Sequence, residues 1–191
     1  LISQAKTGLS ALALMRHLGV SYQTAWLVHH KLMAVMTARE ERYVLEGQVQ
    51  IDDAYLGGER NGGTAGRGSE NKVPFIAAVS LTHDGRPVRA KLTPVATFSS
   101  EAVAQWARSN LAVGCTVHSD GLGCFRAVTT AGCRHEPVTI AGRKPKEMPE
   151  FQWVNTVLGN LKTSLSGCYP AFGFRKYAAR YLGAFAYRFN R

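Results

Sequence analysis

A short stretch that carries two adjacent acids constrains this chain more than any other. Residues 48–55, Gln-Val-Gln-Ile-Asp-Asp-Ala-Tyr, alternate between polar and apolar side chains and lead into the pair Gly57-Gly58. This alternation predicts a β-strand that ends in a turn. Aspartate is uncommon inside strands, and burying an unpaired carboxylate costs free energy. Asp52 and Asp53 therefore indicate either a solvated strand end with a turn cap, or a site that holds a metal ion.

The chain is strongly basic. Its 191 residues include 23 Lys and Arg against 13 Asp and Glu, which gives a formal net charge of +10, and 46% of them are hydrophobic. That content suffices for one core with a small appendage. A globular chain this basic commonly binds a polyanion, with nucleic acid the first candidate and an anionic membrane surface the second. Because the sequence has no apolar run near the ~20 residues that cross a bilayer, we expect no membrane span.

The cysteines and the start of the chain bear on its compartment. No two of the four cysteines are spaced as C-x-x-C, so a structural zinc site is not expected, and their spacing does not resemble a disulfide framework. We expect reduced thiols packed in the core of a cytoplasmic protein. The first residues lack the basic and apolar regions of a signal peptide, and the missing initial Met suggests a fragment.

Residues 1–42 are expected to form a helical segment of their own. Apolar side chains recur there at helical spacing, with Ser10 as N-cap of a first helix, Gly19 in the turn and Ser21 as N-cap of a second helix. This is the pattern of a helix-turn-helix, although such hairpins are also frequent in proteins that never touch DNA. In a DNA-binding role, the contacts would come from the start and flank of the second helix. The residues expected there are Gln23, Thr24 and His30.

Residues 43–191 are expected to form one α/β domain. Three antiparallel strands followed by two α/β units give a mixed five-stranded sheet with helices on both sides. In this arrangement the first and fourth strands are central neighbours, so Asp52 and Asp120 should meet at one sheet edge. Strands are predicted at residues 48–55, 73–81, 88–94, 115–119 and 136–140, and helices at residues 100–111, 122–130, 149–165 and 174–189.

Two segments of this domain have the composition of phosphate-binding loops. Glycines at residues 57–72 leave backbone N–H groups free to approach a phosphate chain, while a hairpin tip without a partner is the alternative. A second, basic segment precedes the helix predicted at residues 149–165. The side chains expected to hold the DNA backbone are Arg67, Lys72, Arg143, Lys144 and Lys146.

Facing carboxylates favour a particular class of metal ion. Two of them repel each other unless a cation lies between them, and their hard oxygen atoms suit Mg²⁺ or Mn²⁺. Two such ions ~4 Å apart can activate a nucleophile and stabilise the leaving oxygen of a phosphodiester. On the helix predicted at residues 149–165, Asn155 offers an amide oxygen as a third ligand. Lys162 follows two turns later on the same face, where it can hold a DNA phosphate.

Five motifs are informative as a set. They are Ile-Asp-Asp-Ala-Tyr-Leu-Gly-Gly at residues 51–58, Gly-Arg-Gly with Asn-Lys within residues 66–72, Ser-Asp-Gly at residues 119–121, Trp-Val-Asn-Thr at residues 153–156 and Phe-Ala-Tyr-Arg-Phe-Asn-Arg at residues 185–191. Together they resemble a bacterial insertion-sequence transposase of the ISXO-like branch, the insertion-sequence 1595 family. The resemblance runs from the helix-turn-helix to the C-terminus, and it implies a catalytic domain with a ribonuclease-H-like fold.

The resemblance also implies roles for individual residues. Asp52 and Asp120 match the first two catalytic acids and Asn155 the third position in the branch that uses Asn, followed by Lys162. Strand alternation places Asp52 and Asp53 on opposite faces, and the family pattern favours Asp52 as the ligand. Where other branches carry a Glu just after the third position, this chain has Leu158, which makes Glu147 and Glu150 alternative third ligands.

The hypothesis that follows is a metal-dependent DNA transposase. It would cleave one end of an insertion sequence and transfer the freed 3′-hydroxyl to target DNA, acting as a homodimer on double-stranded DNA in the bacterial cytoplasm. Two rivals remain at this point: a ribonuclease-H-like nuclease or Holliday-junction resolvase, and a DNA-binding remnant without catalysis. Metal-dependent cleavage of DNA that contains the element's end separates the remnant from the enzymes.

Overall fold

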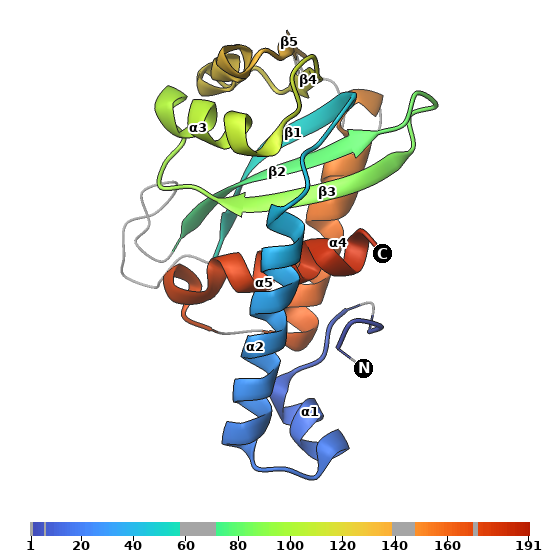
Figure 1. Ribbon diagram of the computed structural model, residues 1–191, viewed down its shortest axis with the longest axis vertical. Coiled ribbons are helices and arrows are strands. Elements are labelled where there is room, and N and C mark those ends of the chain that lie inside the picture. The colour runs from blue at the N-terminus through green and yellow to red at the C-terminus, as the bar shows by residue number, and fades with distance from the viewer. Residues whose placement is uncertain (1, 6, 58–71, 139–147, 170–171) are drawn as a thin grey trace.

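Two helices precede a mixed sheet (Figure 1). The structure is a computed structural model that describes residues 2–5, 7–57, 72–138, 148–169 and 172–191. Helix α1 (Ala11–Leu18) is capped by Ser10, whose Oγ accepts a hydrogen bond from Ala13 N at 3.1 Å. Gly19 turns the chain with φ 66°, and Ser21 Oγ caps α2 (Tyr22–Glu41) by accepting from Thr24 N at 3.2 Å. These caps confirm the predicted start of both helices and the predicted end of α1.

The sheet has the ribonuclease-H-like arrangement that was predicted. Its strand order is β3-β2-β1-β4-β5, in which β1 runs antiparallel to β2 and parallel to β4. The central neighbours β1 and β4 are therefore the two strands that lead to Asp52 and Asp120. β5 begins two residues before its predicted start and lies at the sheet edge, where its proline is tolerated. The strands are β1 (Gln48–Leu56), β2 (Val73–Leu81), β3 (Pro87–Pro94), β4 (Thr116–Ser119) and β5 (Arg134–Pro137).

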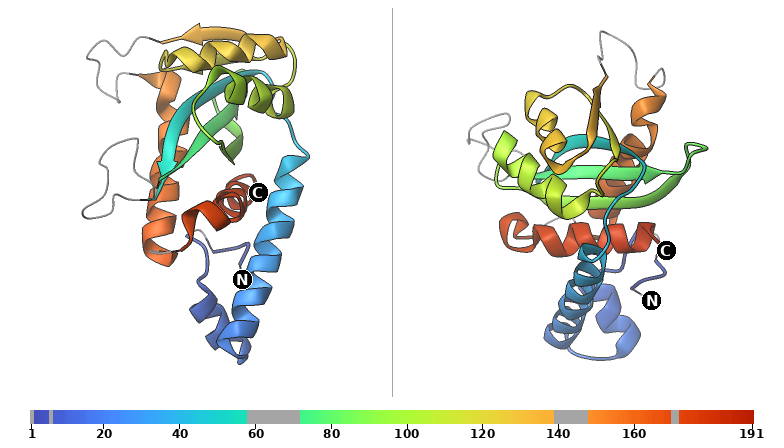
Figure 2. Two further views of the ribbon diagram at one scale, coloured as in Figure 1. Left: turned by 90° about the vertical axis from the view of Figure 1, so that its left-hand side faces the viewer. Right: turned by 45° about the horizontal axis from the view of Figure 1, so that its top comes forward.

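Helices cover both faces of the sheet (Figure 2). One face packs against α3 (Ser100–Asn110) and η2 (Gly123–Ala131), and its core includes Ile51, Val117 and Trp106. The other face packs against α4 (Gln152–Cys168), which follows the short turn η4 (Pro149–Phe151), and against α5 (Phe174–Phe189). The helix predicted at residues 122–130 is a 3₁₀ helix, consistent with the consecutive β-branched residues 128–130, which disfavour an α-helix.

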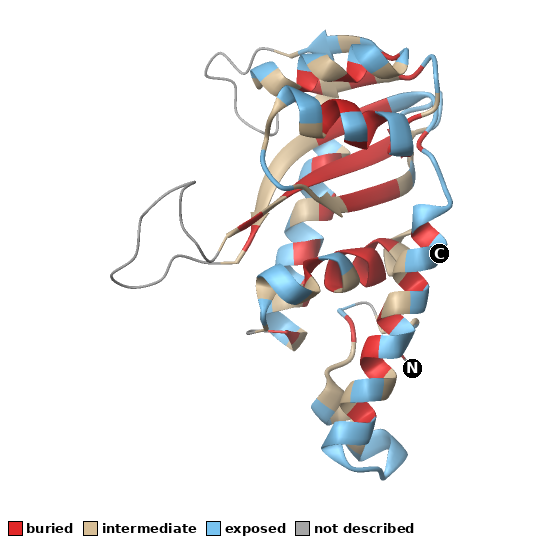
Figure 3. Ribbon diagram, turned by 60° about the vertical axis from the view of Figure 1, so that its left-hand side comes forward, coloured by how far each residue is buried: buried red, intermediate tan, exposed pale blue. Residues whose placement is uncertain are grey.

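Helix α2 lies across α5, and a third cluster of buried side chains joins them (Figure 3). Met33 and Met36 of α2 pack in this cluster with Tyr181 and Ala184 of α5. Gly183 lies at the closest approach, because a Cβ atom built there would be 2.8 Å from Cβ of Thr37. The absence of a side chain at Gly183 thus sets how closely the two helices pack.

A matched pair of glycine substitutions tests this crossing. Gly183→Ala should lower the free energy of unfolding by about 1–3 kcal/mol, because overpacking a close contact outweighs the better helix propensity of alanine. Gly159→Ala, at an exposed position of α4 with no atom within 4 Å of its added Cβ, should raise that free energy by up to about 1 kcal/mol. Urea unfolding of both variants measures the difference, and equal signs would contradict the packing argument.

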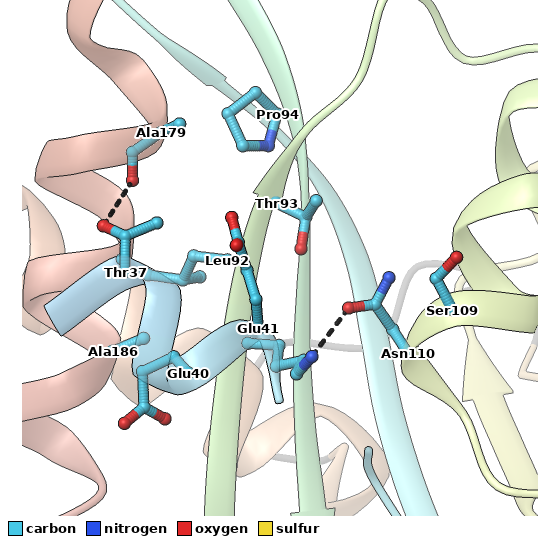
Figure 4. A pocket seen from close by; sticks show the side chains of 12 residues that line it. Thr37, Glu40, Glu41, Leu92, Thr93, Pro94, Ser109, Asn110, Ala179 and Ala186 are labelled. Carbon is cyan, nitrogen blue, oxygen red and sulfur yellow. Dashed lines mark hydrogen bonds between the residues drawn. The ribbon is translucent and has the colours of Figure 1, made fainter. Parts of the chain in front are cut away.

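Polar contacts tie the end of α2 to β3. Beside them lies a cavity of about 220 Å³, whose lining includes Glu40, Leu92 and Asn110 (Figure 4). Buried Glu40 accepts hydrogen bonds from Arg89 Nη1 at 3.1 Å and from Asn190 Nδ2 at 2.6 Å. Asn190 also bonds to both backbone groups of Ala90 on the edge strand β3. The closing motif of the sequence therefore has a structural role, because it covers the edge of the sheet. None of the described helices has the length and apolarity to cross a lipid bilayer.

Candidate functional site

Two neighbouring strands bring distant acids together. The parallel register of β1 and β4, continued by two residues, places Asp52 beside Asp120. Carboxylate oxygens of Asp52, Asp53 and Asp120 all lie within 4.8 Å of one another, and all three residues are partly buried. The predicted meeting of Asp52 with Asp120 is thus confirmed, and Asp53 joins them. The register pairs are Gln48 with Thr116, Val49 with Val117 and Gln50 with His118.

Local hydrogen bonds orient the acids. Asp52 Oδ1 accepts from Asp53 N at 2.9 Å, and Asp120 Oδ1 accepts from Leu122 N at 3.1 Å. Directly before Asp120, buried Ser119 bonds through Oγ to His135 Nε2 at 2.9 Å, which fixes the end of β4 against β5. Gly121, at φ 84°, adopts the left-handed turn that takes the chain away from the site. The Ser-Asp-Gly motif accordingly fixes the position of the Asp120 carboxylate.

Burial and the neighbouring acids change the pKa of Asp52. Burial, followed by the negative charges of Asp120 and Asp53, raises the pKa of Asp52 from 3.8 to about 7, although the bond from Asp53 N acts in the opposite direction. A divalent cation would relieve this repulsion and replace the lost hydration of the carboxylates. Three carboxylates in reach of one another, all hard oxygen donors, fit Mg²⁺ or Mn²⁺.

The predicted third ligand and its lysine lie on α4. Asn155 and Lys162 are exposed there, next to a buried stripe that packs on the sheet and includes Val154 and Leu161. Lys162 lines a cavity of about 490 Å³, together with Leu158 of α4 and residues at the end of β1. Of the alternative third ligands, Glu150 is not part of the three-carboxylate cluster, and Glu147 lies outside the described residues.

The predicted DNA contacts have different outcomes. Gln23 and Thr24 are exposed in the first turn of α2, as expected, and Lys72 is partly buried just before β2. The expectation for His30 is wrong: α5 covers this side of α2, so His30 is 3% exposed, lies 4.0 Å from the ring of Trp26 and bonds to Arg180. Four further predicted contacts fall outside the described residues, namely Arg67, Arg143, Lys144 and Lys146.

Comparison with known proteins gives these acids a context. The family model of the ISXO2-like transposase domain matches residues 44–190, which include all three carboxylates, Asn155 and Lys162. The chain belongs to this family. The ISXO2-like domain begins just before β1 and ends with α5, so the sheet and the carboxylate cluster lie within it.

Solved structures and curated proteins say less about this chain than the family model does. The ISXO2-like domain and its helical segment are similar to a chain in a cryo-electron microscopy structure of the simian T-cell lymphotropic virus intasome in complex with the PP2A regulatory subunit B56 gamma. The TM-score is 0.39 and the identity 15%, with 93% of this chain covered; the match spans 61% of the other chain. No curated protein matches the sequence.

Proposed function

We propose that this member of the ISXO2-like family cleaves DNA at the end of an insertion sequence and joins that end to target DNA, using Mg²⁺ or Mn²⁺. The observation that carries the proposal is the cluster of Asp52, Asp53 and Asp120 within 4.8 Å, inside a transposase-family domain. A metal-dependent phosphodiester reaction requires hard oxygen donors held close together, and here the ends of two adjacent strands hold them.

Each polar group around the cluster receives a role in this proposal. Asp52 and Asp120 hold the cation, with Asp53 near enough to contribute, and Asn155 supplies an amide oxygen from α4. Lys162, exposed on the same side of α4, binds a DNA phosphate and so orients the strand. When bound, the divalent cation supplies Lewis-acid stabilisation of the charge that develops on the phosphoryl oxygens.

The reaction has two displacements at phosphorus. In the first, a water oxygen attacks the phosphodiester at the element's end; the bond from phosphorus to the 3′-oxygen breaks, and a 3′-hydroxyl and a 5′-phosphate result. In the second, this 3′-hydroxyl attacks a target phosphodiester, so one phosphodiester forms as another breaks and the displaced 3′-oxygen takes up a proton. The side chains around the carboxylates hold the DNA of the element's end and of the target so that the attacking and leaving oxygens lie in line at phosphorus.

DNA binding is assigned to the basic surface and the helical segment. The net charge of +10 favours a polyanion, and residues 1–42 present Gln23 and Thr24 to a DNA groove while residues 43–191 carry catalysis. Arg67, Lys72 and the basic residues 143–146 contact the backbone in this proposal. Two copies of the chain would act on double-stranded DNA, one for each end of the element.

Metal dependence tests the proposed function. The substrate is a labelled duplex that carries the element's own terminal sequence, with a plasmid as target, in Mg²⁺, in Mn²⁺ or in EDTA. Cleaved and joined products are expected with either metal and not with EDTA. A protein that binds the duplex but forms no product with Mg²⁺ or Mn²⁺ would be a DNA-binding remnant, and the proposal would be wrong.

A further inference from the structure

One buried side chain links the acid-bearing strand to the helix of Asn155. Gln50 is 2% exposed and lies on β1 two residues before Asp52, on the same face of the strand. Its Oε1 accepts from Trp153 N at 2.9 Å and from Val154 N at 3.0 Å, while its Nε2 donates to Pro149 O at 3.2 Å. All three contacts are with backbone groups of η4 or of the first turn of α4.

Helix α4 needs such a partner because it has no cap of its own. The first N–H groups of a helix have no intrahelical acceptor, and a side chain normally supplies one. In α1, α2 and α3 a serine directly before the helix does so, whereas Phe151 before α4 makes no such bond. Gln50 thus acts as an N-cap that reaches α4 from the central strand of the sheet, about a hundred residues away in sequence.

We propose that Gln50 is a positioning residue for the metal site, an inference that rests on the proposed function. Asp52 follows Gln50 by two residues on β1, and Asn155 directly follows Val154, whose N–H Gln50 binds. The amide of Gln50 therefore fixes the first turn of α4 against the strand that carries Asp52. Without it, α4 can slide or rotate relative to β1, so that Asn155 and Asp52 are no longer held for the same cation. Misplacements of about 1 Å can lower rates by about 100-fold.

Two substitutions of Gln50 separate capping from size. Gln50→Leu fills the space but removes the acceptor and the donor. It should slow strand transfer at saturating DNA by about 10- to 100-fold and raise the Mn²⁺ concentration for half-maximal rate, with DNA affinity little changed. Gln50→Glu keeps an acceptor for both N–H groups, at a helix N-terminus where negative charge is favourable, but loses the donor to Pro149 O, and should recover part of the rate. Hydrogen exchange of the Trp153 and Val154 amides reports the cap directly.

A cap on the opposite face of the sheet provides the control. Ser99 Oγ accepts from Ala102 N at 3.2 Å at the start of α3, so Ser99→Ala removes a helix cap without touching α4. It should lower the melting temperature and leave the rate and the Mn²⁺ dependence unchanged. Comparing it with Gln50→Leu separates lost stability from lost positioning.

The outcomes distinguish this inference from the function on which it rests. If Gln50→Leu loses amide protection at Trp153 and Val154 but keeps the wild-type rate and Mn²⁺ dependence, positioning by Gln50 is wrong and the proposed function stands. A Gln50→Glu rate no higher than that of Gln50→Leu also overturns it. If the wild-type protein shows no strand transfer with any metal, the proposed function fails, and the role of Gln50 fails with it.

Discussion

Asp52→Asn and Asp120→Asn are each expected to abolish strand cleavage and strand transfer while leaving DNA binding largely intact. Each change removes one negative charge from the three-carboxylate cluster and leaves an amide of similar size, so the cation loses its strongest ligand without a steric change. A loss of at least about 1,000-fold in rate is expected, equivalent to about 4 kcal/mol of transition-state stabilisation. Product formation on end-containing duplex in Mg²⁺ or Mn²⁺ measures the rate, and fluorescence anisotropy measures DNA affinity.

Two further aspartates complete this experiment. Asp84 lies exposed in a turn between β2 and β3, so Asp84→Asn repeats the chemical change away from the cluster and should retain the wild-type rate. Asp53→Asn tests the carboxylate that comes from the other face of β1; its expected effect is a higher metal requirement with a smaller loss of rate. Wild-type activity of Asp52→Asn or Asp120→Asn would remove these acids from the mechanism.

Much of the architecture follows from local patterns. Serine caps, a turn glycine and apolar periodicity predict α1 and the start of α2 as observed, because these signals act within a few residues. The meeting of Asp52 with Asp120 is less local, but it follows from strand order: once β1 and β4 are parallel neighbours, residues at the ends of both must converge. That step needs the topology of the sheet and no knowledge of side-chain packing.

The third carboxylate shows where strand alternation stops being informative. Alternation places the side chains of Asp52 and Asp53 on opposite faces of β1, and the core clusters agree for the neighbouring apolar residues. However, β4 ends at Ser119, so no residue of that strand lies beside Asp53 to keep its carboxylate away from Asp120. At the end of a strand, a flexible acid can therefore reach the edge that both faces share, as the 4.8 Å limit on the cluster shows.

Contacts between distant segments account for what the sequence did not reveal. Gln50 reads as an ordinary polar residue in a strand, and nothing near it indicates that its amide caps a helix at Trp153. His30 reads as an exposed residue of α2, but it is buried, because α5 packs on the side that carries it; the apolar side chains of Leu32 and Val35 are exposed instead. On the side packed against α5, Thr37 closely approaches Gly183, a contact between distant segments that a periodic pattern does not encode.

Asp52→Asn should also make the metal-free protein more stable at pH 8 than the wild type, and not at pH 4. The pKa of Asp52 is raised from 3.8 to about 7 in the folded protein, so between these values the folded state binds more protons than the unfolded state. Wild-type stability therefore falls as the pH rises through this window, by about 1–3 kcal/mol once solvent screening of a partly exposed group is included. Asparagine does not titrate, so Asp52→Asn lacks this pH dependence of stability. Urea unfolding in EDTA at pH 4, 6 and 8 measures the difference between the two proteins, in which the titration of all other groups largely cancels.

Adding metal at pH 8 should reverse the order of stability. A cation that binds the folded carboxylates and not the unfolded chain stabilises the wild type by about 4.1 kcal/mol at 1,000 times its dissociation constant, whereas Asp52→Asn lacks a main ligand and should gain little. Asp84→Asn should follow the wild type both with and without Mn²⁺, because its carboxylate is exposed in a turn outside the cluster. If the free energies of unfolding of the wild type and Asp52→Asn changed in parallel with pH, the pKa of Asp52 would not be raised in the folded protein. An equal gain from Mn²⁺ in both proteins would place the cation elsewhere, since burial and the neighbouring negative charges, which together raise the pKa of Asp52, are what a cation at this site offsets.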